Sequence, residues 1–148
     1  MNHLKRLIGV LSITAISVLI TNGLVCAQDA EKYFNVGSDS NGDRFLLDTT
    51  TMGELDTITM GKKKHKLGEV LKIYQFKDDL KFEYMLHASC GDERLWMVGS
   101  RVFDRNTGRK ISEGKEDKEI PVTGDSLGNI VMKYYCQAIK ARGWVQQQ

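Results

Sequence analysis

The sequence predicts an α+β domain in which a single antiparallel sheet of about six strands carries one C-terminal helix, packed on a face of the sheet and tethered to it by a disulfide. Three observations predict this fold. Apolar and polar residues alternate with period two along the middle of the chain, which is typical of strands. The spacing changes to that of a helix near the C-terminus. Cys90 and Cys136 lie in the strand region and the helix region, respectively.

A charged and then apolar segment opens the chain. Lys5 and Arg6 precede a run over residues 7–20 that is apolar apart from scattered Ser and Thr, and Asn22 and Gly23 end this run. The order is typical of a secretory signal peptide, which has to be set aside before the fold is considered.

The end of this segment predicts where the chain is cut. Val25 and Ala27 suit the third and first positions before a signal peptidase site, so we expect residues 1–27 to be removed and residues 28–148 to form a single exported domain, secreted or periplasmic. Cys26 would leave with the signal peptide. Two alternatives stay open: lipidation of Cys26, although the residues before it fit a lipoprotein site poorly, and an uncleaved membrane anchor, since the apolar run approaches the length that spans a bilayer.

The charge balance argues against a nucleic-acid partner. The chain has 21 Lys and Arg against 19 Asp and Glu. Two of the basic residues, Lys5 and Arg6, lie in the signal peptide, which contains no acidic residue, so the exported domain is neutral. Nucleic-acid binding normally requires a strong positive excess on one face. The remaining length suits one domain with its own core.

Cys90 and Cys136 are the two cysteines that remain after cleavage. Pairing is the default state of cysteines in an oxidising compartment, so we expect a Cys90–Cys136 disulfide. Neither residue belongs to a close-spaced Cys or His pair, and only His65 and His87 remain in the exported domain, so we expect no metal site. His87 lies on a predicted strand and is expected to be a sheet residue rather than a ligand.

The clearest strand covers residues 80–90. One face of this stretch is apolar and the other is polar, which predicts a half-buried antiparallel strand that ends at Cys90. The apolar face carries Leu80, Phe82, Tyr84, Leu86, Ala88 and Cys90, and the polar face carries Lys81, Glu83, His87 and Ser89.

Further strands and turns surround it. Residues 94–104 are expected to form the next strand, with CGDE as the hairpin between the two and DRNTG as the following hairpin loop. Asn41-Gly42 is the strongest hairpin signal earlier in the chain, and residues 55–60 and 69–77 are further strand candidates. In 94–104 the alternation puts Trp96, Val98 and Val102 on one face and Met97, Arg101 and Phe103 on the other.

The C-terminal stretch has helical spacing. Asp125 or Ser126 can cap its start, and Gly143 is a plausible end. Cys136 borders the apolar stripe and can therefore face the sheet. The apolar residues that recur at helical spacing are Leu127, Ile130, Val131, Tyr134 and Ala138.

The order of these features resembles the small exported domains of the surface-adhesin protein E family. The resemblance covers about residues 33–141 and implies a curved antiparallel sheet with a C-terminal helix tethered by one disulfide. It also implies adhesion to extracellular matrix or plasma proteins without catalysis. Phe34 stands where the family pattern has Trp, and Pro121 is more widely spaced from Ser126 than usual. The residues that carry the resemblance are Phe34-Asn-Val, NGDRFLLD, the strand that ends at Cys90, the hairpin VFDRNTG, Pro121 and the helix with VMKYYC.

The stretch GDSL at residues 124–127 matches the nucleophile block of the GDSL esterases. A serine of that kind needs a downstream acid and histidine to orient and activate it. No histidine follows His87. We therefore favour a structural role, in which Asp125 or Ser126 caps the helix.

The stretch DSNGD resembles the opening of a calcium loop, with Asp39, Asn41 and Asp43 at positions one, three and five. Position six is Arg44, where such a loop requires Gly, and position twelve is Thr50, where it requires Glu. A hairpin turn is therefore favoured over a calcium site.

The stretch GKKKHKLG has the character of a binding site. Lys62, Lys63, Lys64 and Lys66 crowd, together with His65, into a predicted loop between two glycines. Their field would attract a sulfated glycan, a phosphate, acidic lipid head groups or an acidic protein patch, and salt would weaken it. The alternative, which we favour, is a solvated hairpin loop whose charges keep neighbouring strand edges from pairing with other chains.

Two functions of different class fit these observations. The first is a non-catalytic exported binding or adhesion module that uses the sheet, with the lysine loop as an accessory contact to an extracellular protein or an acidic glycan or lipid surface. The second is a periplasmic structural or accessory protein of the cell envelope without an external target. An enzyme is disfavoured because no acid, base and nucleophile can be assembled, and we expect no cofactor.

Overall fold

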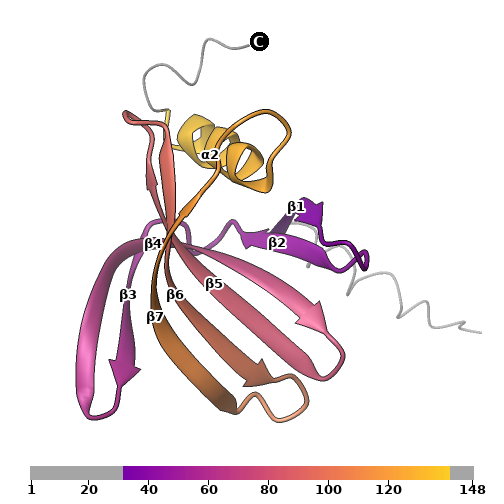
Figure 1. The fold of residues 1–148 in the computed structure, drawn as a ribbon, viewed down its shortest axis with the longest axis vertical. Coiled ribbons are helices and arrows are strands. Elements are labelled where there is room, and N and C mark those ends of the chain that lie inside the picture. The colour runs from indigo at the N-terminus through magenta and orange to yellow at the C-terminus, as the bar shows by residue number, and fades with distance from the viewer. Residues whose placement is uncertain (1–31, 141–148) are drawn as a thin grey trace, which may run out of the picture.

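The computed structural model describes residues 32–140, which form seven antiparallel strands and one helix (Figure 1). The predicted class, one antiparallel sheet with a C-terminal helix, is confirmed, with one strand more than expected. The elements are β1 (Tyr33–Ser38), β2 (Arg44–Asp48), β3 (Glu54–Met60), β4 (Lys63–Lys77), β5 (Leu80–Ser89), β6 (Arg94–Asp104), β7 (Lys110–Ile120) and α2 (Leu127–Ala138).

The strands do not all pair with their neighbours in the sequence, so the sheet is not a simple meander. Its order is β1-β2-β4-β5-β6-β7, and β3 pairs with β4 outside this path. β4 makes this possible because it is 15 residues long, about 50 Å when extended. Its first part pairs with β3, and residues 73–75 pair with β2. The β3–β4 hairpin therefore projects from the rest of the sheet (Figure 1).

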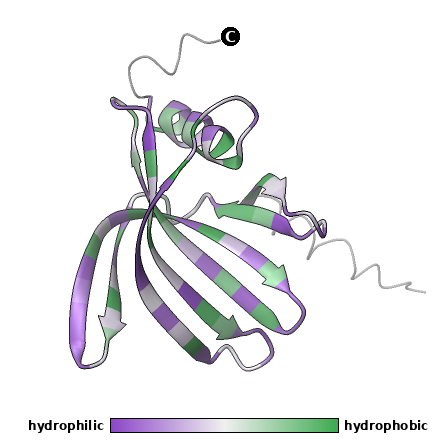
Figure 2. Cartoon of the chain, viewed as in Figure 1, coloured by the Kyte–Doolittle hydropathy of each residue, from purple (hydrophilic) through white to green (hydrophobic). Residues whose placement is uncertain are grey.

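The helix side of the sheet carries the larger core. Figure 2 shows hydrophobic and hydrophilic residues alternating along β5 and β6, as expected for strands with distinct faces. Each fully buried aliphatic side chain in this core contributes about 1.5–3 kcal/mol. The buried residues are Val36, Leu47, Leu71, Ile73, Leu86, Leu95, Val131, Met132 and Cys136.

The predicted disulfide is confirmed. Cys90, directly after β5, is bonded to Cys136 on α2, and the two Cα atoms are 5.8 Å apart. The helix gains a second attachment from Phe34 on β1, whose ring stacks on Tyr134 with centroids 4.3 Å apart. Both ends of the described chain are thereby joined on the same side of the sheet.

The prediction that β5 is only half buried is wrong. Glu83 is 5% exposed and Met85 is fully buried, although both lie on the face away from the helix. The sheet curls so that β3 approaches β7, and the curl encloses a second core on that face. This core consists of Ile58, Leu67, Val70 and Met85, with Val98 packed against it.

The predicted alternation along β6 is also wrong in part. The register shifts between Met85 and Leu86, opposite Met97 and Gly99. This bulge adds one residue to β6 and reverses the faces on its two sides. As a result, Met97 shares the helix side with Val102, whereas Trp96 lies on the opposite face beside His87.

The helix begins as predicted and ends earlier. Ser126 is its N-cap, and the helix stops at Ala138 rather than near Gly143 because Lys140 turns into the left-handed conformation at φ 53°. Close to its start, Gly128 lies against β7: a Cβ added there would stand 2.1 Å from the Pro121 carbonyl oxygen. Only glycine allows this close approach.

The predicted signal peptide, residues 1–27 with Cys26, lies outside the described residues. Between residues 32 and 140, none of the helical structure has the length and apolar character needed to cross a bilayer.

Candidate functional site

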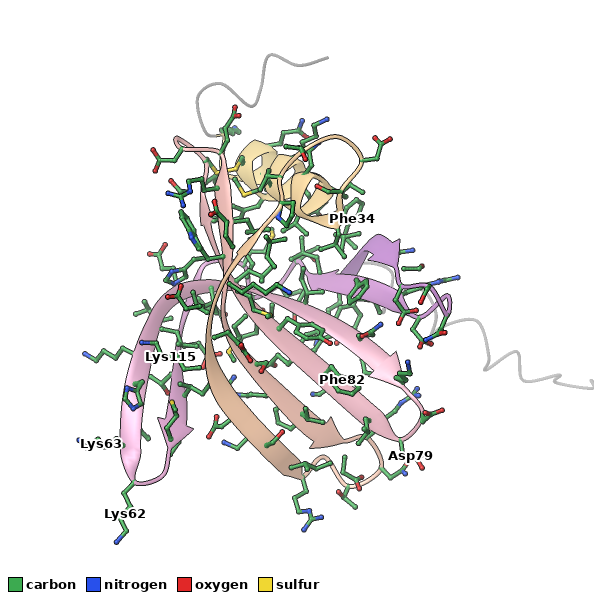
Figure 3. The ribbon with its side chains drawn as sticks, viewed as in Figure 1. Phe34, Lys62, Lys63, Asp79, Phe82 and Lys115 are labelled. Carbon is green, nitrogen blue, oxygen red and sulfur yellow. A yellow bond between two sulfur atoms is a disulfide. The ribbon has the colours of Figure 1, made fainter. Side chains whose placement is uncertain are left out.

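An aromatic row lies on the helix side of the sheet. It consists of Phe45 on β2 and of Phe82 and Tyr84 on β5, all only partly buried. The centroid of the Tyr84 ring is 6.3 Å from that of Phe45 and 6.5 Å from that of Phe82. The rings of Tyr84 and Phe82 are nearly parallel, with 10° between their planes. Phe82 lies well away from the helix in Figure 3. The row is a preformed apolar platform of the kind that binding surfaces use.

A chain of hydrogen bonds fixes one side of the row. The Tyr84 hydroxyl donates to Gln75 Oε1 at 3.4 Å, and Gln75 Nε2 donates to Asp39 Oδ2 at 2.9 Å. Burial, followed by the nearby charge of Asp39, raises the pKa of Tyr84. The protonated hydroxyl is the form that donates to Gln75.

Asp39 belongs to the predicted β1–β2 turn. Its Oδ1 accepts from the backbone N–H groups of Asn41, at 2.9 Å, and Asp43, at 3.0 Å. Among residues 32–140 no three Asp, Glu, His or Cys side chains gather in a way that could hold a metal ion. The structure thus uses DSNGD as a hairpin turn.

A cavity, which we call the inter-layer cavity, lies between the sheet and the start of α2 and is continuous with the aromatic row. Its volume is about 280 Å³, close to the lower limit of small-molecule pockets. Phe45 and Tyr84 belong to both the row and the cavity, so the two form one apolar surface. The lining residues are Phe45, Ile73, Tyr84, Leu86, Met97, Lys118, Ile120 and Leu127.

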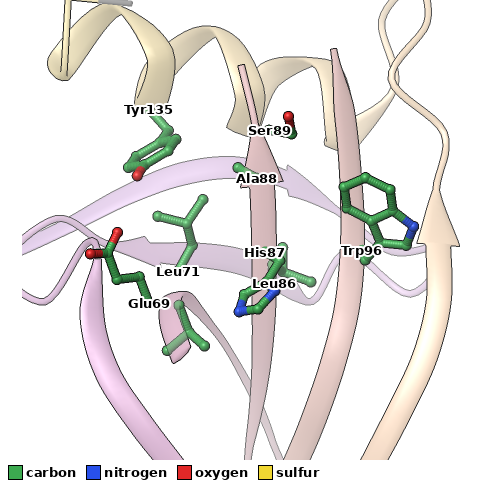
Figure 4. A pocket seen from close by; sticks show the side chains of 10 residues that line it. Glu69, Leu71, Leu86, His87, Ala88, Ser89, Trp96 and Tyr135 are labelled. Atoms are coloured by element: carbon green, nitrogen blue, oxygen red, sulfur yellow. The ribbon is translucent and has the colours of Figure 1, made fainter. Parts of the chain in front are cut away.

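A second depression, the histidine hollow, opens where β4 leaves β5 (Figure 4). The last residue pair of these strands is Leu71 with Leu86, and beyond it the strands diverge. The hollow has a volume of about 380 Å³ and lies among residues of β4, β5, β6 and α2. It is lined by Gly53, Glu69, Val70, Leu71, Leu86, His87, Ala88, Ser89, Trp96 and Tyr135.

The polar groups of the histidine hollow do not form a catalytic relay. His87 Nε2 is buried and has no hydrogen-bond partner among the described residues. Ser89 donates instead to Asp92, at 2.7 Å. Burial, followed by the charge of Glu69, raises the pKa of Tyr135. A nucleophile bonded to a base that is in turn oriented by an acid is not present here.

Ser126, the serine of the GDSL motif, caps the helix. Its hydroxyl accepts from the Asn129 N–H at 3.2 Å and donates to the Pro121 carbonyl at 3.0 Å. Both bonds are structural, because they satisfy a free N–H of the first helical turn and fix the preceding loop. Between the two candidate caps in the sequence, Ser126 rather than Asp125 takes this role.

The predicted lysine loop is largely strand. Gly61 and Lys62 form a tight turn, and Lys63, Lys64, His65 and Lys66 belong to β4. The four lysines are exposed and form no ion pair within the described part of the chain. Successive side chains on a strand point to opposite faces, so their charge is divided between two sides of the hairpin. Lys62 and Lys63 lie at its far tip in Figure 3, remote from Phe34 and the helix.

Sequence reasoning missed an ionic cluster on the face away from the helix. Arg101 on β6 donates to Glu83 at 2.7 Å and to Glu113 at 3.3 Å, and it holds Asp56 on β3 as well. Lys72 adds a second cation 3.1 Å from Asp56. Lys110 pairs with Glu113 in turn, so three cations face three carboxylates and the cluster holds the strands together. Glu83 pairs with Arg101 only because of the bulge in β6, since the register of the hairpin near Ser89 and Arg94 would pair it with Ser100, so the sequence held no simple signal for this cluster.

The comparisons with known proteins give no relative. No protein-family model, no curated protein and no solved structure matches the chain.

Proposed function

We propose that the chain is a non-catalytic exported binding module of a bacterial cell envelope, in which the helix side of the sheet contacts the partner. The observation that carries this proposal is the aromatic row of Phe45, Phe82 and Tyr84. Its rings are partly exposed, Phe82 and Tyr84 are stacked, Phe45 is tilted against Tyr84, and Gln75 accepts a hydrogen bond from Tyr84. Rigid aromatic side chains that remain accessible supply binding energy at a low cost in conformational entropy.

Two further observations support the proposal. The curved sheet with a C-terminal helix tethered by one disulfide agrees with what the resemblance to the surface-adhesin protein E family implies. The disulfide fits an oxidising compartment outside the cytoplasm. We assign the lysines of the β3–β4 hairpin an accessory role, because all four are exposed and Lys62 and Lys63 lie at the tip of the hairpin, where an acidic surface can reach them.

The experiment compares two phenylalanine variants of the purified, disulfide-bonded protein. Phe82→Ser shortens the aromatic row, whereas Phe103→Ser removes a ring of similar exposure from the opposite face, where it contacts Lys81. Binding to immobilised extracellular-matrix and plasma proteins is measured for both. The proposal requires Phe82→Ser to weaken binding by about tenfold or more, the value of a strong contact residue, and Phe103→Ser to leave it unchanged.

Protease treatment of intact cells separates the proposal from its alternative, a periplasmic structural or accessory protein. A surface module is removed from intact cells, whereas a periplasmic protein is cut only after the envelope is opened. Retention of the full-length protein on shaved cells would favour the alternative.

A further inference from the structure

We propose that the inter-layer cavity binds one free fatty acid, with the acyl chain between α2 and the sheet and the carboxylate at Lys118. This inference rests on the proposed binding role of the helix side of the sheet, and it assigns a small-molecule ligand to that face. The cavity shares Phe45 and Tyr84 with the aromatic row, but Lys118 and Leu127 line the cavity alone and Phe82 belongs to the row alone, so variants at these residues let the two proposals fail separately.

The walls of the cavity suit an apolar chain. Apart from Lys118, its lining consists of aliphatic, thioether and aromatic side chains from β2, β4, β5, β6, β7 and α2. The one hydroxyl among them, on Tyr84, is directed to Gln75. A cavity of about 280 Å³ with such walls gains free energy when methylene groups replace water in it.

Lys118 determines the head group. It is the one charged side chain in the lining, it is exposed, and it forms no ion pair with any residue between 32 and 140. A lysine of this kind packs its aliphatic stem on apolar walls and keeps its ammonium group in water. Asp39 is connected to Tyr84 of the aromatic row through Gln75, and its negative charge repels an anion from that end of the row. The charges therefore orient an amphiphile with its acid at Lys118.

The size of the cavity selects a single acyl chain. A volume of about 280 Å³ lies below the usual range for drug-sized ligands and leaves no room for two long chains. In a zwitterionic phospholipid, repulsion between the ammonium group and Lys118 offsets part of the attraction between Lys118 and the phosphate. A chain longer than the cavity can continue over Phe45 and Tyr84 onto the ring of Phe82.

Calorimetry with a series of saturated fatty acids below their micelle concentrations tests the proposal. From octanoate to dodecanoate the affinity should rise by about fourfold per methylene and then level off once the cavity is full. The alcohol of equal length should bind about tenfold more weakly, because it lacks the charge-assisted contact. Lysophospholipids and zwitterionic vesicles should bind more weakly than the free acid.

Two charge variants and one filling variant complete the design. Lys118→Glu should abolish the preference for acid over alcohol. Lys115→Glu makes the same charge change on the same strand but lies outside the cavity lining, so it should retain the preference. Leu127→Trp should fill the cavity and remove binding of both ligands, with the disulfide intact and the urea midpoint checked in each variant.

Different results would overturn the role of Lys118 and the role of the cavity. Equal binding of acid and alcohol by the unmodified protein, or equal loss in Lys118→Glu and Lys115→Glu, would overturn the assignment of Lys118. Binding without dependence on chain length, or binding that survives Leu127→Trp, would overturn the cavity as the site. Normal partner binding by Leu127→Trp, together with loss of fatty acid, would leave the proposed adhesion function standing on its own.

Discussion

Arg101 on β6 and Asp56 on β3 are joined by two hydrogen bonds, of 2.9 Å and 3.1 Å, although their strands are not neighbours in the sheet. Arg101 also donates to the Thr57 carbonyl, and the carboxylate of Glu113 on β7 accepts from the Thr59 N–H. Side chains therefore satisfy backbone groups on the outer edge of β3, which an open sheet would leave available to other chains. The curl of the sheet is closed by charge rather than by a strand ladder.

Removing the arginine should open this closure. Arg101→Met leaves the carboxylates of Asp56 and Glu83 without their main partner, and their side chains are 14% and 6% exposed. Loss of one partner of a buried pair costs about 3–5 kcal/mol, and we expect about 3 kcal/mol because the Arg101 side chain is 13% exposed. Arg101→Lys should recover only part of this loss, because an ammonium group cannot form the forked contact.

Urea unfolding followed by circular dichroism measures the effect. The control is Arg94→Met, which breaks the exposed ion pair with Glu119, in which both side chains are about half exposed. Exposed pairs contribute little, so this variant should keep the midpoint of the unmodified protein. Equal midpoints for the Arg94 and Arg101 variants would show that the ionic cluster does not stabilise the fold.

The same cluster predicts a loss of stability in acid. Burial acts to raise the pKa of Asp56, but hydrogen bonds from Arg101, Thr57 and Lys72 outweigh it and lower the pKa from 3.8 to about 2. The ionised carboxylate therefore stabilises the fold above pH 3.8, and this contribution disappears as the pH falls through about 2.

The measurement is the free energy of unfolding of the unmodified protein and of Asp56→Asn at several pH values. The difference between them should be constant from pH 7 to pH 5 and should shrink as Asp56 becomes protonated. A difference that stays constant down to pH 2 would contradict the low pKa of Asp56.

The disulfide should provide a large share of the stability. Cys90 and Cys136 are 46 residues apart, and closing a loop of this size restricts the unfolded chain by about 4 kcal/mol in the entropy model. The double variant Cys90→Ala/Cys136→Ala should unfold at a clearly lower urea concentration. Addition of a reductant should lower the midpoint of the unmodified protein and leave that of the variant unchanged. A midpoint shared by the two oxidised proteins would contradict this role.

Features encoded by a few adjacent residues could be predicted from the sequence. The Asn41-Gly42 turn, the Ser126 cap and the pairing of Cys90 with Cys136 each follow from local chemistry or from the cysteine count. The alternation in β5 correctly identified the face that carries Leu86. These signals do not depend on the position of any distant strand.

The remaining features depend on contacts between distant segments. Glycines and lysines made the start of β4 look like a loop, but pairing with β3 imposes a strand there. Glu83 was placed on the polar face of a half-buried strand because alternation distinguishes the two faces of a strand and does not reveal that the sheet curls over one of them. The inter-layer cavity was missed because its walls come from β2, β4, β5, β6, β7 and α2, which only the fold brings together. The close approach of Gly128 to Pro121 depends on the fold in the same way.

That approach can be tested with a glycine pair. In Gly128→Ala the new methyl group would collide with the Pro121 carbonyl, so the start of α2 must shift. Overpacking of this kind costs about 1–3 kcal/mol, which offsets the gain of about 1 kcal/mol in helix propensity. Gly114→Ala, which has open space around the added Cβ, is the control. The prediction fails if thermal unfolding gives Gly128→Ala a stability at or above that of the unmodified protein.

The lysine hairpin should give the protein a weak affinity for polyanions. Lys62, Lys63, Lys64 and Lys66 are exposed and lack ion-pair partners between residues 32 and 140, so their charge is available to a sulfated glycan. Changing all four to Ser should abolish retention on a heparin column at low ionic strength. Retention of the unmodified protein should fall steeply as salt is added, because the lysines are exposed to the screening ions.

A charge-matched variant distinguishes the hairpin from net charge. It changes four lysines outside the hairpin to Ser, namely Lys77, Lys115, Lys133 and Lys140. If only the position of the hairpin lysines matters, this variant elutes close to the unmodified protein while the hairpin variant passes through the column. Because the hairpin divides its lysines between two faces, a flat polyanionic surface engages only part of the set, and we therefore expect elution well below physiological salt. Equal elution of the two variants would mean that the hairpin is a solvated strand connection whose charges only protect its edges.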